Sequence, residues 1–206
     1  MQHFTSIYIL VPVGLRDKLF ISTYCQMKSH GPWKIKKTNE VYRDPFIHVW
    51  QDDVIRPDGQ DGSHVVVSMK PGVCVLAIDE ALNVHLTDEF HYGVGRHTLE
   101  AVSGGIEPDE DPDITARREL AEELGIQAAK WEFLTTVDPF TTIMISPTRL
   151  YFATQLSDVP SNPDGTELIK RQVIPLQSAC EQISNGQITH APTCNLILMA
   201  QQRFLN

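Results

Sequence analysis

Three glutamates in the middle of the chain have the spacing that metal-dependent chemistry requires. Glu119, Glu122 and Glu123 are three and four residues apart, so on a helix their carboxylates share one face. Like charges at these spacings repel each other, and a helix gains no stability from grouping them. Hard divalent cations, by contrast, require clustered carboxylate oxygens. The grouping indicates a cation site, and the alternative interpretation is an acidic face that is only solvated.

The residues on either side of the glutamates predict the helix that positions them. Asp111 is a good N-cap, Pro112 suits the first helical position, and Gly125 suits the left-handed residue that ends many helices. We therefore expect a helix over residues 112–124. An apolar stripe beside the glutamates would dock this helix on a sheet, and it consists of Ala116, Leu120 and Leu124.

Short apolar and β-branched runs separated by turn signals predict the remaining elements. Strands are expected at 33–37, 41–42, 46–55, 64–69, 73–78, 84–90, 98–102, 131–137, 149–155 and 169–174, and two further helices at 176–184 and 192–204. This order predicts an α+β fold, an α/β/α sandwich with a small N-terminal antiparallel β-unit. The expected division is 31–69 for the β-unit and 70–206 for the main domain. Residues 1–30 are interpreted as a leader, either a disordered segment or an over-long start.

The composition narrows the classes of partner and the compartment. With a formal net charge of −9 and a pI near 5.3, the chain is a poor candidate for binding nucleic acid or an anionic membrane. The apolar run 7–13 follows no Lys or Arg and is shorter than the ~20 residues of a membrane span. Neither a signal peptide nor a membrane helix is therefore expected. The four cysteines have no CxxC spacing, so reduced thiols and a cytoplasmic protein are expected.

The spacing around the glutamates resembles the signature of the Nudix hydrolases. The match includes every defined position of that signature: Gly104, Glu110, Arg118, Glu119, Leu120, Glu122, Glu123, Gly125 and Ile126. The resemblance implies Mg²⁺-dependent hydrolysis of a pyrophosphate bond, with Mn²⁺ as the alternative ion. It makes Glu119, Glu122 and Glu123 the metal-binding set, joined by the backbone carbonyl of Ser103.

Further roles follow from the same resemblance. Gly104 would stand where the backbone turns, and Glu110 and Arg118 would brace the loop against the helix. Arg118 is counted with the catalytic residues because it can also orient a carboxylate. The base that deprotonates the attacking water often lies in a loop before the last strand, where Glu167 is the candidate, and Glu122 is the alternative base.

A weaker resemblance, over residues 33–204, extends to the ADP-ribose and nucleoside-diphosphate-sugar pyrophosphatases. It rests on the stretches 41–45, 58–59, 89–92 and 100–104. Within them, two pairs of residues depart from the branch pattern: Glu89 and His91 replace Gln and Arg, and Val102 and Ser103 replace Pro and Ala. The resemblance implies ADP-ribose as the substrate, hydrolysed to AMP and ribose 5-phosphate, with GDP-mannose or a UDP-sugar as alternatives.

Four residues outside the signature are candidates for contact with the small nucleotide substrate. Glu100 and His91 belong to the stretches that resemble the sugar-nucleotide branch. Trp33 and Trp50 could stack a nucleobase, and core or interface packing is the alternative for each. The β-unit 31–69 is too small to bury its own core. In the resembling branch this unit packs across a two-fold axis, so a homodimer is expected.

Two other functions stay open. The first is a nucleoside triphosphatase that uses the same helix, although the N-terminal unit and the region around Glu100 argue against it. The second is a non-catalytic sensor that binds a nucleotide sugar and regulates a partner. The presence of every signature glutamate argues against the sensor.

Overall fold

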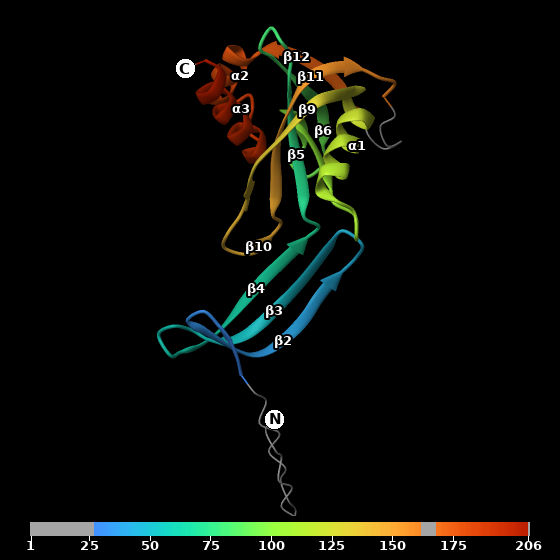
Figure 1. Ribbon diagram of the computed structural model, residues 1–206. Coiled ribbons are helices and arrows are strands. Elements are labelled where there is room, and N and C mark those ends of the chain that lie inside the picture. The colour runs from blue at the N-terminus through green and yellow to red at the C-terminus, as the bar shows by residue number, and fades with distance from the viewer. Residues whose placement is uncertain (1–26, 162–167, 206) are drawn as a thin grey trace, which may run out of the picture.

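The computed structural model describes residues 27–161 and 168–205, which form two β-sheets and three helices (Figure 1). All three helices flank the larger sheet, with one helix on one face and two on the other. The expected α+β class and the α/β/α sandwich are therefore confirmed. Residues 1–26 of the predicted leader lie outside the described ranges.

The smaller sheet contains the N-terminal strands and one strand from later in the chain. Its order is β1-β2-β3-β4-β10. The bounds are β1 (Lys28–His30), β2 (Trp33–Arg43), β3 (Ile47–Ile55), β4 (Asp61–Met69) and β10 (Met144–Ile145). Strands β1 to β4 pair antiparallel, as expected, whereas β10 pairs parallel with β4. A segment of the main domain therefore covers one edge of this sheet.

This sheet corrects the prediction at three points. Residues 28–30, assigned to the leader, form β1, because Gly31 with φ of 56° turns the chain so that His30 pairs with Trp33. Strand β2 is continuous where two short strands were expected, because two β-bulges absorb its irregular pattern. Strand β10 was not predicted, since two residues show no periodicity.

The larger sheet has the order β12-β6-β5-β11-β9, and β7 pairs with β6 while β8 pairs with β5. The bounds are β5 (Gly72–Ile78), β6 (Asn83–His91), β7 (Arg96–Glu100), β8 (Val102–Gly105), β9 (Ile126–Val137), β11 (Thr148–Asp158) and β12 (Lys170–Pro175). Each corresponds to an expected strand, except that the single strand expected at 98–102 is divided between β7 and β8.

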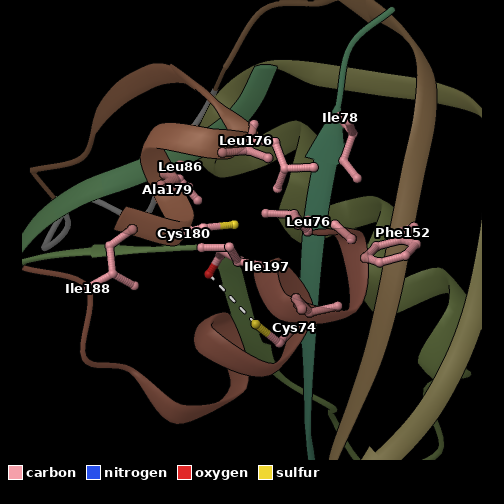
Figure 2. Packing of buried hydrophobic residues seen from close by; sticks show 14 of the residues in the cluster. Cys74, Leu76, Ile78, Leu86, Phe152, Leu176, Ala179, Cys180, Ile188 and Ile197 are labelled. Atoms are coloured by element: carbon pink, nitrogen blue, oxygen red, sulfur yellow. Dashed lines mark hydrogen bonds between the residues drawn. The ribbon is translucent and has the colours of Figure 1, made fainter. Parts of the chain in front are cut away.

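Strand β5 is buried on both faces and separates two apolar layers. Successive side chains of a strand point to opposite faces of its sheet. One face packs under helices α2 (Leu176–Ser184) and α3 (Ala191–Phe204) through Cys74, Leu76 and Ile78 (Figure 2). The other face packs under helix α1 (Pro112–Leu124) through Val73, Val75 and Ala77. All six side chains are at most 2% exposed, so β5 is the centre of the sandwich.

Helix α1 begins and ends where the sequence predicts. The side chain of Asp111 accepts a hydrogen bond from the backbone N–H of Asp113, and Gly125 ends the helix with φ of 62°. The helix packs on β8, β5 and β9. Its buried stripe consists of the predicted Ala116, Leu120 and Leu124, together with Thr115. Because this stripe faces the sheet, the neighbouring glutamates lie at the border between core and solvent.

The loop before α1 is braced against the helix by a bidentate ion pair. Arg118 Nε lies 3.1 Å from Glu110 Oε1, and Arg118 Nη2 lies 3.2 Å from Glu110 Oε2. Glu107 donates its backbone N–H to Glu110 and receives Lys70 Nζ at 2.8 Å, which extends the brace to the start of β5. The expected bracing of the loop is therefore confirmed. The hydrogen bonds from Arg118 lower the pKa of Glu110 to about 2.

The Glu110→Gln variant should lose stability in a pH-dependent way. Because the pKa of Glu110 in the folded state is about 2, below its ordinary 4.5, the ionised carboxylate stabilises the fold fully above about pH 4.5. This stabilisation is lost as the pH falls through about 2. Thermal unfolding in EDTA should give the variant a lower Tm at pH 7, and the difference should shrink towards pH 2.5.

The matched control is Glu80→Gln, because Glu80 is an exposed glutamate on the β5–β6 turn. Its Tm should follow that of the wild type at every pH. A Tm deficit of Glu110→Gln that stays constant from pH 7 to pH 2.5 would contradict the brace.

Candidate active site

Arg118 also contacts two of the three glutamates on α1. Its Nη1 lies 2.8 Å from Glu119 Oε1 and 2.9 Å from Glu122 Oε2. With the two bonds to Glu110, one guanidinium contacts three carboxylates. These contacts, chiefly the one to Glu110, raise the pKa of Arg118 above its ordinary value. The guanidinium therefore offsets the repulsion that the grouping of like charges creates.

Glu119 reaches the backbone of β8 because residue 104 has no side chain. A Cβ on Gly104 would lie 2.1 Å from Cδ and 2.2 Å from Oε1 of Glu119, distances that atoms do not tolerate. Gly104 was expected where the backbone turns, and this expectation is wrong. It lies inside β8, paired with Val73, and is not among the glycines with positive φ. Glycine is needed there for close approach and not for its dihedral freedom.

The buried thiol of Cys74 in β5 contacts the stretch of chain between β7 and β8. Its Sγ lies 3.9 Å from the carbonyl oxygen of Ala101, the residue that follows Glu100. Burial raises the pKa of this thiol to about 12, and the charges of Glu100 and Glu123 act in the same direction. Ser103 Oγ lies 3.2 Å from Cys74 Sγ and 2.9 Å from the carbonyl oxygen of Ala101. Of the predicted site residues, Ser103 therefore contacts this thiol directly.

The carboxylates suit a hard cation in their chemistry. As the side chains stand, no group of three or more His, Cys, Asp or Glu residues within 27–161 and 168–205 is arranged to hold a metal ion. In this arrangement Arg118 contacts Glu119 and Glu122. The donors nevertheless fit Mg²⁺, because they are carboxylates on one helix face, and Glu119 lies against the strand that carries the carbonyl of Ser103. The metal-binding roles of these residues stay predictions.

Glu100 and His91, predicted separately as substrate contacts, lie side by side at the β6–β7 hairpin. His91 Nε2 lies 3.4 Å from Glu100 Oε1, and the carboxylate is only 13% exposed. The other oxygen, Oε2, lies 3.1 Å from Nδ1 of His190. His190 was not predicted, since it follows Glu100 by 90 residues (190 − 100) without any ligand spacing. The available signal was its position just before the helix expected at 192–204.

Trp33 and Trp50 line one pocket of about 810 Å³, formed by the smaller sheet, including β10, and the preceding residues 141–143. The ring centroid of Trp33 lies 5.8 Å from that of His64, and the ring centroid of Trp50 lies 4.8 Å from that of His48. Neither Glu100 nor any glutamate of α1 lines this pocket. Within the described part of one chain, the tryptophans and the carboxylates are therefore not brought together.

Three further findings bear on the expectations. Glu167, the predicted base, lies outside the described residues, so its role stays a prediction. The described cysteines, Cys74, Cys180 and Cys194, are free thiols. In the described ranges no helix is long and apolar enough to cross a membrane.

Two family profiles match most of the chain. The NUDIX domain matches residues 69–194, and the nucleoside diphosphate sugar hydrolase N-terminal domain matches residues 33–67. The first match contains α1 and the four glutamates at and near it, which are Glu110, Glu119, Glu122 and Glu123. The second contains Trp33 and Trp50, which line the pocket.

Individual proteins with similar sequences carry different names. The chain is 26% identical to a methanol dehydrogenase activator of Bacillus methanolicus over 162 residues, 78% of this chain and 88% of that protein. It is 27% identical to an ADP-ribose pyrophosphatase of Bacillus subtilis over 183 residues, 85% of this chain and 95% of that protein.

The fold has a counterpart among solved structures. A crystal structure of an ADP compounds hydrolase superposes with a TM-score of 0.72 at 21% identity, covering 86% of this chain and 97% of that one. Enzymes with the NUDIX domain generally use divalent metal ions and act on small nucleotide substrates. The NUDIX match covers more than half of this chain, and all signature residues are present. This chain therefore belongs to the Nudix hydrolase family.

Proposed function

We propose that this protein is a Mg²⁺-dependent pyrophosphatase that hydrolyses ADP-ribose to AMP and ribose 5-phosphate. The observation that carries the proposal is the intact signature on α1, combined in one chain with a nucleoside diphosphate sugar hydrolase N-terminal domain. The choice of base and sugar is supported by the Bacillus subtilis relative, which is named ADP-ribose pyrophosphatase and matches 85% of this chain.

The proposed metal ligands are the carboxylates of Glu119, Glu122 and Glu123 and the carbonyl of Ser103. Bound Mg²⁺ supplies positive charge beside the diphosphate and lowers the pKa of coordinated water. Arg118 contacts Glu110 through Nε and Nη2, and Glu119 and Glu122 through Nη1. Rearrangement of the glutamates around a cation therefore leaves the brace to Glu110 available. This separation supports the proposal that Arg118 keeps the loop and the helix aligned during the reaction.

The remaining roles concern the attacking water and the sugar. The proposed base is Glu167, with Glu122 as the alternative because it lies on the same helix face as the proposed ligands. Glu100 and His91 are proposed to contact the substrate, since their side chains lie 3.4 Å apart and are only partly exposed. Water then attacks one phosphorus atom and the bridging P–O bond breaks, which releases the two monophosphates.

The smaller sheet is proposed to bind the nucleobase across a homodimer. Only Asp52 and Val54 of strands β1 to β4 are buried, so this sheet lacks a core of its own in a single chain. The pocket lined by Trp33 and Trp50 offers aromatic faces for stacking. A two-fold partner would complete both the core and the substrate site. The division into units 31–69 and 70–206 and the cytoplasmic location are parts of the same proposal.

A panel of substrates tests the proposed reaction. With Mg²⁺, ADP-ribose should have a kcat/KM at least roughly tenfold above those of GDP-mannose, UDP-glucose and ATP. Mass spectrometry should identify AMP and ribose 5-phosphate as the products. A higher kcat/KM for GDP-mannose or UDP-glucose would overturn the substrate, and a preference for ATP would overturn the assignment to the sugar-nucleotide branch while leaving the family intact.

The Glu123→Gln variant separates a catalytic role from a structural one. Loss of this ligand should lower kcat by at least roughly 10³-fold, because charge stabilisation of the transition state is lost. The Tm in EDTA should stay equal or rise, because the change relieves carboxylate repulsion and leaves the three contacts of Arg118 in place. Mg²⁺ should raise the Tm of the wild type more than that of the variant.

The control for this variant is Glu181→Gln, which changes an exposed helical glutamate on α2 and should alter neither kcat nor the response to Mg²⁺. If Glu123→Gln unfolds in EDTA while its folded fraction stays active, the glutamates are structural and the proposal is wrong.

Light scattering tests the proposed assembly. At micromolar concentration the mass should be about twice the 23.2 kDa of one chain. A monomer under these conditions would exclude a substrate site shared across a dimer.

A further inference from the structure

Glu100 is held from both sides by groups of different elements. Thr98 Oγ1 donates to Glu100 Oε1 over 2.7 Å, and His91 Nε2 lies 3.4 Å from the same oxygen. His190 Nδ1 lies 3.1 Å from Oε2. Because the carboxylate is only 13% exposed, these contacts and not solvent determine which way it faces.

His190 is itself anchored at the start of α3. It is the N-cap residue of that helix, and its Nδ1 also lies 2.9 Å from Thr193 Oγ1. Thr193 is fully buried, and its hydroxyl oxygen accepts the backbone N–H of Ala101 at 2.9 Å. Ala101 connects β7 to β8, so the ring is fixed to the stretch of chain that lies between Glu100 and Ser103.

The neighbours of Nδ1 determine where the proton on the imidazole lies. An ionised carboxylate has no hydrogen to donate, so Glu100 Oε2 in that form acts only as an acceptor. The hydroxyl oxygen of Thr193 already accepts the backbone N–H of Ala101. An unprotonated Nδ1 would lie 3.1 Å from this carboxylate oxygen with no proton between them, so we assign the proton to Nδ1. Burial lowers the pKa of His190 below its ordinary 6.5, which makes the ring neutral near pH 7, with Nε2 unprotonated.

We propose that His190 is a positioning residue whose Nδ1–H holds the carboxylate of Glu100 in the orientation that accepts hydrogen bonds from hydroxyl groups of the substrate. The inference rests on the proposed function, because it takes Glu100 as a substrate contact. With Thr98 on one oxygen and His190 on the other, the remaining lone pairs of the carboxylate are the ones left for the substrate. Loss of His190 therefore weakens substrate binding without removing any group of the metal site.

NMR of ¹⁵N-labelled histidine tests the contact without any substrate. Above the pKa of His190, long-range ¹H–¹⁵N correlations should identify the Nδ1–H tautomer in the wild type. In Glu100→Ala the acceptor is gone, and His190 should revert to the Nε2–H tautomer that free imidazole side chains favour. An Nε2–H tautomer in the wild type would overturn the inference.

Kinetics of two variants test the consequence for the substrate. His190→Ala should raise the KM for ADP-ribose at least about tenfold, the cost of losing a hydrogen bond to a charged group, with kcat within about threefold. His190→Asn should restore KM to within about threefold of the wild type, because the amide nitrogen of asparagine can occupy the position of Nδ1. Equal KM values for the two variants would overturn the positioning role, and so would an unchanged KM in His190→Ala.

The matched control is His97→Ala. His97 makes a similar contact, with its Nδ1 2.8 Å from Asp88 Oδ1, but it points to the opposite face of β7 from Glu100. This variant should keep the KM of the wild type. If the wild type hydrolyses no compound of the panel, the proposed function fails, whereas a failed inference leaves turnover intact and changes only the tautomer or the KM pattern.

Discussion

One guanidinium holds three carboxylates that would otherwise repel one another, and the geometry of the site depends on this arrangement. Arg118 contacts Glu110 through two of its nitrogens and both Glu119 and Glu122 through a third. The first contacts fix the loop to the helix, and the second align two glutamates on one face. Carboxylates this close together need a positive charge nearby, whether or not a metal ion is bound. Arg118 supplies that charge where no metal ion contributes it.

The packing of α1 against the sheet provides the second constraint. The buried stripe through Ala116 and Leu120 brings the helix so close to β8 that Glu119 lies against the backbone of Gly104. Any side chain at position 104 would displace either the carboxylate or the helix. The backbone of residue 104 therefore limits where the carboxylate of Glu119 can lie. Packing in the core and the contacts of Arg118 thus both act on the position of Glu119.

The two sheets differ in how completely they are covered. Strand β5 is buried on both faces by helices, whereas no helix formed by residues 27–161 or 168–205 packs on the sheet of β1 to β4 (Figure 1). Its contact with the main domain includes the short strand β10. The aromatic pocket lies at this junction, apart from the carboxylates. A substrate with a nucleobase at one end and a diphosphate in the middle needs both places, which is why the proposed site extends beyond one chain.

Local sequence determined α1, its caps and the face that its glutamates share, because helical period and capping depend on residues within a few positions of one another. The positions of most strands along the chain and the family were also predictable, since alternation and signature spacing are local patterns. The contact of His190 with Glu100, the pairing of β10 with β4 and the reason for glycine at position 104 were not. Each of these joins residues from different elements. Their distances depend on how helices pack on the sheet, and the tertiary structure alone decided them.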